Sequence, residues 1–383
     1  MFDDQSLMRA AELATGQNDW GTPLFREPLS ILARALRDEA SLNELGVRRA
    51  ERRLVDALSA RLQLNAARSF DPGIAQEPIS RPIFVIGLPR AGTTFLHSLL
   101  AQDPAHRSPA TWEMRAPSPP PEEATYLTDP RIAETDEALR FEGFLEPELQ
   151  GIHPFAARRS EECNFMWEQS LLSVNFMAFW NVPSYTRHLY ATDFTPVYRE
   201  HRQFLQHLQR RFRRERWVLK SPAHSAWLPQ LLTVYPDACI VQCHRDPAKV
   251  LPSLSSNLAA LRRLFSDKVE VSDFGMARLQ AESLAVVSRV REQPDMNTRF
   301  IDAHYLDVQA DPLAAVRRIY AHFNLPFTAV AEAAMRAWLE QDRDSHAKGE
   351  RHSYSLEQYR IDLGEIDEAM GPYVRQYGIR LER

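Results

Sequence analysis

Leucines recur every three or four positions through the first part of the chain, with arginine and glutamate residues between them. The recurring residues are Leu29, Leu32, Leu36, Leu54, Leu58 and Leu62. This spacing places them along one face of a helix, as amphipathic helices require. The pattern predicts an N-terminal helical region of a few segments over residues 4–66, with breaks near Pro23 and Gly46.

A different pattern follows, made of short apolar runs that end in polar or loop-forming residues. These runs lie at residues 83–86, 217–219, 238–243 and 299–304. Their length is typical of β-strands rather than helices. A helical segment over residues 227–235 separates two of the runs, and a strand–helix–strand unit with this spacing places its strands parallel in one sheet.

These elements indicate an α/β fold, with a central parallel sheet flanked by helices and preceded by a helical region. We expect an N-terminal helical region over residues 1–76 and an α/β domain over residues 77–383. Further helices are expected over residues 94–102, 312–323 and 355–360, and irregular chain over residues 68–82 and 116–121, which are rich in proline.

The middle of the chain, residues 131–215, is mostly helical in pattern and rich in aromatic residues. They include Phe165, Trp167, Phe176, Phe179, Trp180 and Tyr185. One interpretation is an ordinary helical core, and the other is that some of these rings line an apolar pocket for a small molecule. The sequence leaves both open.

Composition narrows the class of protein. The chain has 383 residues, 44% apolar and 25% charged residues and a net charge of −5, which is ordinary for a soluble globular protein of one large or two domains. Nothing in this charge favours nucleic acid as a partner. No targeting segment and no run of about 20 apolar residues is present, so we expect a cytoplasmic protein without a membrane span. The oligomeric state is left open.

The three cysteines fit the same picture. Cys239 and Cys243 stand four apart in an apolar run, and Cys163 is far from both. Three cysteines give no disulfide framework, and a metal site needs more ligands than this spacing offers. We therefore expect buried thiols and no metal.

Residues 83–98 carry the most information about chemistry, and read Ile-Phe-Val-Ile-Gly-Leu-Pro-Arg-Ala-Gly-Thr-Thr-Phe-Leu-His-Ser. A strand, a tight loop and a helix N-terminus follow one another, and this arrangement binds anions through backbone N–H groups and the helix dipole. Gly87 and Gly92 have the spacing of a phosphate-binding P-loop, but Thr93 replaces its lysine and Arg90 lies inside the loop. A site for ATP and magnesium is therefore disfavoured.

Two further cations follow strand ends. Lys220 comes directly after the run 217–219, and Arg245 follows the run 238–243. Ligands of parallel sheets bind beyond the carboxyl ends of the strands. We therefore expect Arg90, Lys220 and Arg245 to lie on one rim of the sheet.

With these motifs, the chain resembles the sulfotransferases that use 3′-phosphoadenosine 5′-phosphosulfate, in their soluble bacterial branch. The resemblance runs from about residue 80 to the end and rests on residues 89–94 and on Arg245-Asp246-Pro247 with Ser253. It implies a three-layer sandwich like that of P-loop nucleotidases. It also implies in-line transfer of a sulfonate group to a hydroxyl or amine acceptor, adenosine 3′,5′-bisphosphate as product, and no metal.

The resemblance assigns roles to particular residues. Arg90, with Ala91, Gly92, Thr93 and Thr94, corresponds to the loop that holds the 5′-phosphosulfate, although many members have lysine where Arg90 stands. Arg245 and Ser253 correspond to the site for the 3′-phosphate, and Lys220 to a lysine that contacts the sulfonate. Lys348 and Gly349 correspond to a basic loop over the 3′-phosphate, where Ala347 replaces a common arginine; an exposed polar loop is the alternative.

A base must also take the proton of the acceptor. The histidine of the cytosolic eukaryotic members is absent, because Pro222 stands in its place and His224 lies two residues later. Glu113 is our first candidate, since related branches carry a glutamate near this position, and His153 is the second. Glu161 and Glu162 are interpreted as helix-capping or bracing residues, and His97 as a packed or capping residue.

Two other functions compete with this interpretation. A P-loop kinase of a small molecule would need magnesium and ATP, against which the missing loop lysine argues. A non-catalytic nucleotide-binding protein of the same fold would bind adenosine 3′,5′-bisphosphate without transfer, against which the presence of both Arg90 and Lys220 argues. The acceptor is expected to be a small molecule, apolar or phenolic if the aromatic residues line its pocket.

Overall fold

The computed structural model describes residues 2–269, 276–348 and 355–382, which fold into two compact units. A helical unit comprises Met1–Ile79, Pro109–Arg213 and Leu258–Glu270, and a sheet unit comprises Ser80–Ser108, Arg214–Asn257 and Val271–Arg383. The expected bounds, a helical region over residues 1–76 and an α/β domain over residues 77–383, stay a prediction. The helical unit includes two later segments because helices distant in sequence pack together there.

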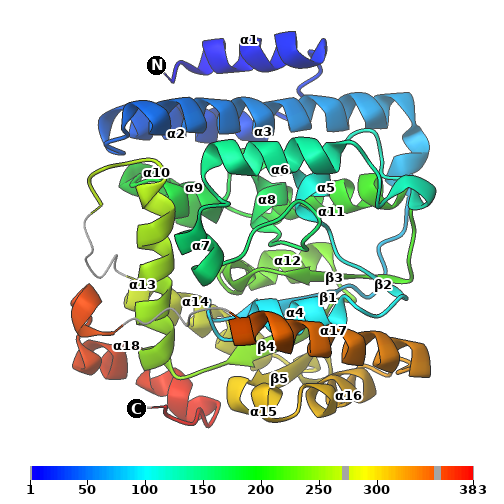
Figure 1. The fold of residues 1–383 in the computed structure, drawn as a ribbon, viewed down its shortest axis with the longest axis vertical. Coiled ribbons are helices and arrows are strands. Elements are labelled where there is room, and N and C mark those ends of the chain that lie inside the picture. The colour runs from blue at the N-terminus through cyan, green and yellow to red at the C-terminus, as the bar shows by residue number, and fades with distance from the viewer. Residues whose placement is uncertain (1, 270–275, 349–354, 383) are drawn as a thin grey trace. The chain divides into compact units, whose positions relative to one another are not determined.

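The sheet unit is built on a parallel sheet (Figure 1), with five strands in the described residues. The strands are β1 (Ile83–Gly87), β2 (His106–Arg107), β3 (Arg216–Lys220), β4 (Cys239–His244) and β5 (Phe300–His304), in the order β2-β3-β1-β4-β5. All four neighbouring pairs are parallel. The central parallel sheet is confirmed, and the expected strands lie within a residue or two of their predicted bounds.

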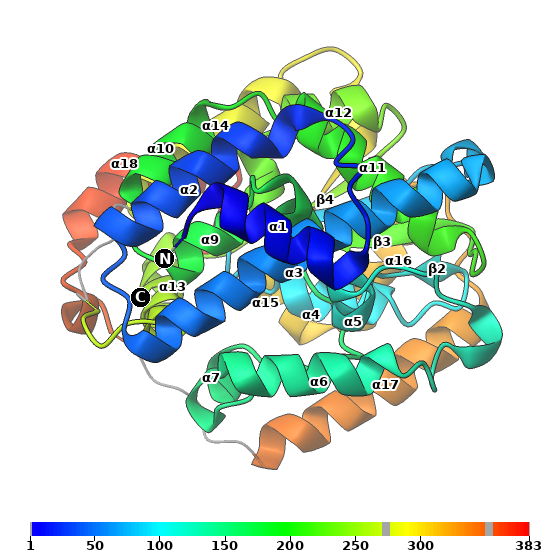
Figure 2. The same ribbon diagram turned by 90° about the horizontal axis from the view of Figure 1, so that it is seen from above.

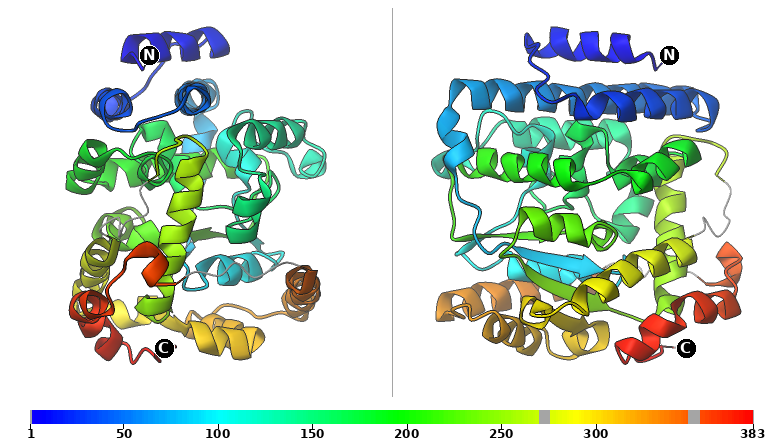
Figure 3. Two further views of the ribbon diagram at one scale, coloured as in Figure 1. Left: turned by 60° about the vertical axis from the view of Figure 1, so that its left-hand side comes forward. Right: turned by 180° about the vertical axis from the view of Figure 1, so that it is seen from behind.

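Helices cover both faces of this sheet. In the described residues of the sheet unit they are α4 (Thr93–Leu100), α12 (Leu228–Val234), α14 (Met276–Arg291), α15 (Tyr305–Ala310), α16 (Pro312–His322), α17 (Ala329–Lys348) and α18 (Leu363–Gln376), with 3₁₀ turns η5 (Pro222–Ser225), η6 (Met296–Arg299) and η7 (Glu357–Tyr359). Helices α4 and α17 lie on one face, and α12 and α14 on the other (Figure 3). The connection from β1 to β2 runs toward one edge of the sheet, and the connection from β3 to β4 runs toward the other edge. Since both crossovers are right-handed, their helices α4 and α12 lie on opposite faces.

The helical unit contains the amphipathic helices expected near the N-terminus. Its helices are α1 (Asp4–Thr15), α2 (Arg26–Asp38), α3 (Glu44–Phe70), α5 (Thr111–Arg115), α6 (Arg131–Glu142), α7 (Pro147–Ile152), α8 (Asn164–Trp167), α9 (Val174–Phe179), α10 (Pro183–Ala191) and α11 (Thr195–Gln209), with η1 (Pro23–Phe25), η2 (Pro72–Gln76), η3 (Glu123–Thr125) and η4 (Glu168–Ser170). Helix α13 (Pro247–Arg263) contributes residues to both units. Viewed from above, α1 lies across α3 (Figure 2).

Two local expectations in this unit have different outcomes. The break at Pro23 is confirmed, because η1 begins there. The predicted break at Gly46 is wrong, because α3 begins at Glu44 and includes the glycine. The Asn43 side chain accepts a hydrogen bond from the Gly46 N–H and so caps this helix.

The aromatic residues of the middle segment form a core, as the first of the two interpretations held. All six of the singled-out rings are buried: Phe165, Trp167, Phe176, Phe179, Trp180 and Tyr185. Several pack on one another, including Phe176 stacked on Trp180 with ring centroids 5.4 Å apart. The cysteines Cys163, Cys239 and Cys243 are likewise buried free thiols, as expected. Among the described residues, no helix is both long and apolar enough to cross a membrane.

Buried ion pairs join the helices of this unit. Arg53 on α3 donates to Glu142 on α6 (2.7 Å) and to Glu168 on η4 (2.6 Å), and Arg115 on α5 also pairs with Glu142. Burial alone would raise the pKa of Glu142, but the charges of Arg115 and Arg53 outweigh it and lower that pKa. A buried ion pair holds only while each charge keeps its partner.

We therefore expect Glu142→Gln to lower the free energy of unfolding by about 3 kcal/mol, because it removes the carboxylate charge that pairs with the buried guanidinium groups of Arg53 and Arg115. Urea unfolding monitored by circular dichroism measures this loss. Glu44→Gln is the matched control, since Glu44 and its partner Arg48 are both exposed. Equal unfolding midpoints for the two variants would show that the buried network does not stabilise the fold.

Candidate active site

The loop between β1 and α4 has an unusual backbone that the sequence specifies locally. Gly87, Arg90 and Gly92 have φ values of 121°, 62° and 84°. A Cβ at Gly87 would lie 2.3 Å from the carbonyl oxygen of Cys243 on the neighbouring strand, and one at Gly92 would lie 3.0 Å from the Tyr305 ring. The two glycines therefore fit the loop for both conformation and space.

This loop delivers the chain into the N-terminus of α4. Gly92 is the N-cap residue, and its position offers no side chain to cap the helix. The first N–H groups of a helix have no partner within it, and the helix dipole adds partial positive charge at the same end. The expected anion-binding geometry, a strand followed by a tight loop and a helix N-terminus, is therefore present.

A buried lysine reaches this loop from the adjacent strand. Lys220 is the last residue of β3, is fully buried, and donates from Nζ to Thr94 Oγ1 at 3.2 Å. Register pairs Val85 of β1 with Lys220, which fixes the lysine beside the strand that leads into the loop. Burying an ammonium group is costly, so a buried lysine beside an anion-binding loop suits a site that receives negative charge.

The two arginines meet on the other side of the loop. Arg90 donates from Nε to Ser253 Oγ at 3.0 Å, and Arg245 donates from Nη1 to the carbonyl oxygen of Arg90 at 3.2 Å. Strands β3, β1 and β4 are neighbours, so their carboxyl ends deliver Lys220, Arg90 and Arg245 to one edge of the sheet. The expectation that these three cations converge is confirmed.

The Arg-Asp-Pro motif divides into a cation and a helix start. Asp246 is fully buried and accepts a hydrogen bond from the Ala248 N–H at 3.0 Å, and its carbonyl accepts from Lys249 and Val250. Pro247 is the first residue of α13, where a proline costs no hydrogen bond. Asp246 and Pro247 therefore build the turn that presents Arg245.

Of the expected basic loop, the structure describes only the first residue. Lys348 is the last residue of α17, and Gly349 lies outside the described residues. Its role stays a prediction.

Glu113, our first candidate base, lies in the helical unit on α5. It is fully buried, and its Oε2 accepts hydrogen bonds from the Ala110 N–H and the Tyr126 hydroxyl, each at 2.8 Å. The carboxylate thus caps the start of its own helix. These two donors fix the orientation of Glu113.

His153, the second candidate, is also in the helical unit and forms a dyad. Its Nε2 lies 2.8 Å from Oε2 of Glu161, and Glu161 Oε1 accepts from the Glu162 N–H at 3.1 Å. A carboxylate beside an imidazole fixes the tautomer and ring orientation, as in general bases. Glu161 braces a histidine rather than only a helix end, which the sequence did not reveal.

The remaining histidines of the motif region are structural. His97 is fully buried, with Nε2 2.8 Å from Ser108 Oγ and 3.2 Å from the Val218 carbonyl oxygen, so its packed role is confirmed. His224 is also buried, and its ring packs edge-on against that of Phe84 on β1, with centroids 5.0 Å apart.

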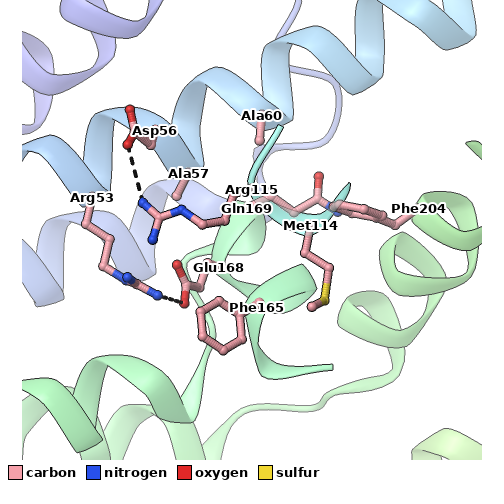
Figure 4. A pocket seen from close by; sticks show the side chains of 10 residues that line it. All are labelled: Arg53, Asp56, Ala57, Ala60, Met114, Arg115, Phe165, Glu168, Gln169 and Phe204. Carbon is pink, nitrogen blue, oxygen red and sulfur yellow. Dashed lines mark hydrogen bonds and ion pairs between the residues drawn. The ribbon is translucent and has the colours of Figure 1, made fainter. Parts of the chain in front are cut away.

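A cavity in the helical unit is a second possible site, and its size argues against it (Figure 4). Its lining residues are Arg53, Asp56, Ala57, Ala60, Met114, Arg115, Phe165, Glu168, Gln169 and Phe204. The cavity has a volume of about 20 Å³, room for about one water molecule. Within the described residues, no group of His, Cys, Asp and Glu could hold a metal ion.

Two residues at the cationic edge were missed from the sequence. Tyr305 directly follows β5, and its ring lies under the Arg245 guanidinium at 3.8 Å from the ring centroid. The strand-end rule that found Lys220 could have found it, because it too follows a strand. Glu382, which pairs with Arg245, lies 137 residues away along the chain and gives no local signal.

Comparisons with known proteins agree with this geometry. A model of the sulfotransferase family matches residues 82–329. The omega-hydroxy-beta-dihydromenaquinone-9 sulfotransferase Stf3 of Mycobacterium tuberculosis (strain CDC 1551 / Oshkosh) is 29% identical over 310 residues, 78% of this chain and 75% of that protein.

Two crystal structures match nearly the whole chain. Sulfotransferase STF1 from Mycobacterium tuberculosis H37Rv has a TM-score of 0.85 and 34% identity, covering 96% of this chain and 98% of that one. Sulfotransferase STF9 from Mycobacterium avium has a TM-score of 0.89 and 28% identity, covering 100% and 98%.

The close packing of Gly87 gives a direct test of the loop. We expect Gly87→Ala to destabilise the protein by about 2–4 kcal/mol, because its Cβ would collide with the backbone of β4 at a φ that alanine avoids. Gly151→Ala is the control, since a Cβ there meets nothing within 4 Å. Thermal unfolding compares the two variants, and an unchanged melting temperature for Gly87→Ala would contradict the packing described.

Proposed function

The chain belongs to the sulfotransferase family and is a sulfotransferase, and from that premise we propose that its sulfonate donor is 3′-phosphoadenosine 5′-phosphosulfate. The observation that carries this proposal is the spread of cations along one sheet edge. Arg90 lies within the loop, Lys220 contacts the loop from β3, and Arg245 follows the neighbouring strand β4. Such a donor supplies a phosphosulfate for transfer and, separately, a 3′-phosphate.

We assign the loop to the 5′-phosphosulfate. The N–H groups at the start of α4 and the hydroxyls of Thr93 and Thr94 offer donors to its oxygens. Arg90 and Lys220 offer the positive charge that stabilises a departing phosphate and a transferring sulfonate. The Lys220 ammonium already donates to Thr94 Oγ1, so the cation and the loop are positioned before the donor arrives.

We assign Arg245 and Ser253 to the 3′-phosphate, with the segment at Lys348 and Gly349 as a further basic contribution. A guanidinium presents paired donors that match phosphate oxygens. Ser253 is held in place by Arg90, so the two proposed phosphate sites share a hydrogen bond at 3.0 Å. ATP has no 3′-phosphate for this second site.

For the base we propose Glu113, with His153 as the second candidate. Support for Glu113 is its fixed carboxylate, which two donors hold from the Ala110 N–H and the Tyr126 hydroxyl. Support for His153 is the Glu161 carboxylate, which accepts from Nε2 and so leaves Nδ1 to take the proton of the acceptor.

For the acceptor we propose a small apolar molecule that carries a hydroxyl group. The support is the relative Stf3, whose name gives a hydroxylated dihydromenaquinone as its acceptor. An amine acceptor is the alternative, since the same base and cations serve it.

The donor assignment is tested by calorimetric titration with adenosine 3′,5′-bisphosphate and with ATP and magnesium. We expect the bisphosphate to bind and ATP to bind far more weakly. Arg245→Ala should lower the affinity for the bisphosphate by about 10- to 100-fold, the contribution of a charge-assisted paired contact. It should lower the affinity for adenosine 5′-monophosphate much less. Arg278→Ala, on the exposed side of α14, is the control. Preference for ATP would overturn the donor, and equal weakening of both nucleotides would overturn the role of Arg245.

The base assignment is tested by steady-state sulfonate transfer. We expect Glu113→Gln to lower kcat by about 10²- to 10⁴-fold while bisphosphate affinity stays unchanged, because a general base acts on the acceptor. Glu44→Gln is the control, since it removes an exposed carboxylate of the same unit, and it should leave kcat unchanged. Retained turnover in Glu113→Gln, together with loss in His153→Gln, would move the base to His153.

A further inference from the structure

Arg245 already holds an anion, and that anion belongs to the protein. Its Nε donates to Glu382 Oε1 at 3.0 Å, and its Nη2 donates to Glu382 Oε2 at 3.2 Å. Both side chains are mostly buried, at 15% and 17% exposure, so solvent screens this pair only in part. The carboxylate occupies the paired donors that a phosphate would use.

The rest of the Arg245 guanidinium is also engaged. Nη1 donates to the Arg90 carbonyl oxygen at 3.2 Å, and the flat face lies on the Tyr305 ring. The guanidinium is thus held in one plane whichever anion it binds. The side that pairs with Glu382 is the side where an incoming anion would compete.

Glu382 is brought to this place by anchored backbone. Its N–H donates to Asp246 Oδ2 at 2.8 Å, next to Arg245 in the motif. Upstream, Arg380 pairs with Asp307, and Ile379 is buried. These contacts hold residues 379–382 beside the start of α13.

Helix α18, which leads into this segment, is tied to the same strand as Arg245. The buried His244 at the end of β4 donates from Nε2 to Asp302 Oδ1 at 2.8 Å, and the Tyr373 hydroxyl of α18 donates to its Nδ1 at 3.0 Å. Burial lowers the pKa of His244, which favours the neutral ring that these roles need. The position of Glu382 therefore follows from the packing of α18 on β4.

We propose that Glu382 sets the affinity of the donor site for 3′-phosphorylated nucleotides: its carboxylate competes with the 3′-phosphate for Arg245. This rests on the proposed function, in which Arg245 anchors that phosphate. A carboxylate and a phosphate cannot share the same paired donors, because two anions a few ångströms apart repel. A phosphate carries more negative charge than a carboxylate, so it can displace Glu382.

The competition acts only on nucleotides that carry a 3′-phosphate. A nucleotide without a 3′-phosphate brings nothing that can replace Glu382, so the ion pair stays closed and the nucleotide binds through the loop alone. A nucleotide with a 3′-phosphate releases Glu382 and gains Arg245. The affinity for 3′-phosphorylated ligands is therefore lower than it would be without Glu382. A product that carries a 3′-phosphate consequently dissociates more easily.

The test is calorimetric titration of the full chain with adenosine 3′,5′-bisphosphate and adenosine 5′-monophosphate. We expect Glu382→Gln and Glu382→Ala to bind the bisphosphate about three- to tenfold more tightly, the worth of a partly screened ion pair. The monophosphate should bind within twofold of the wild type. In the Arg245→Ala background the same substitutions should change neither affinity.

Glu368→Gln is the matched control, because it removes one exposed negative charge from α18 of the same unit and leaves Arg245 paired. It should leave both affinities unchanged. Thermal unfolding adds a second measurement: without ligand, Glu382→Gln should melt no higher than the wild type, and the bisphosphate should raise its melting temperature by more.

The outcomes separate the two claims. If Arg245→Ala does not weaken the bisphosphate, the proposed phosphate site itself fails. If Arg245→Ala weakens it but Glu382→Gln binds equally or more weakly than the wild type, only the competition fails, and Glu382 instead positions Arg245. Tightening of both nucleotides, or tightening by Glu368→Gln as well, would reduce the effect to general charge and overturn the proposal.

Discussion

The close approach of β1 to β4 at Gly87 is the constraint on which the candidate site depends. With no side chain at Gly87, the backbone turns away from the sheet against the carbonyl of Cys243. The loop then runs through Arg90 at positive φ into α4, and the Arg90 carbonyl becomes an acceptor for Arg245 from the end of β4. A bulkier residue at Gly87 would separate the strands whose ends carry the cations. The packing of the backbone at this edge therefore also sets the distances between the cations.

Positive charge concentrated at a sheet edge repels itself unless the protein or a ligand supplies anions. Here the protein supplies some of them: Asp246 is buried beside Arg245, and Glu382 takes its paired donors. Lys220 donates to the hydroxyl of Thr94 in the loop. The edge therefore combines an arginine that pairs with Glu382 and a buried lysine that contacts the anion-binding loop.

In the helical unit, buried cations pair with carboxylates of the protein itself. Arg53 is buried against carboxylates and aromatic rings, and its guanidinium lies 4.4 Å from the centroid of the Phe179 ring. In the network of Arg53, Arg115, Glu142 and Glu168, the ion pairs join different elements and so link α3, α5, α6 and η4. Such pairs specify how helices join, because a shifted helix would leave a charge unmatched in an apolar surrounding. The unit that carries the two candidate bases is thus held by paired charges.

Local sequence determined the elements and the chemistry of the loop. Short apolar runs predicted β1, β3, β4 and β5 nearly to the residue but missed the two-residue β2. Gly87, Arg90, Gly92 and Thr93 predicted an anion-binding loop without the nucleotidase lysine, because strand length, glycine conformation and helix starts are set by near neighbours. The family resemblance then pointed to Arg245 with Ser253. Tertiary structure alone decided what these groups meet. The dyad of His153 with Glu161, the capping of α5 by Glu113, and the pairing of Arg245 with Glu382 join side chains through packing between elements, and nothing in the spacing of the chain encodes which distant carboxylate will arrive at a buried guanidinium.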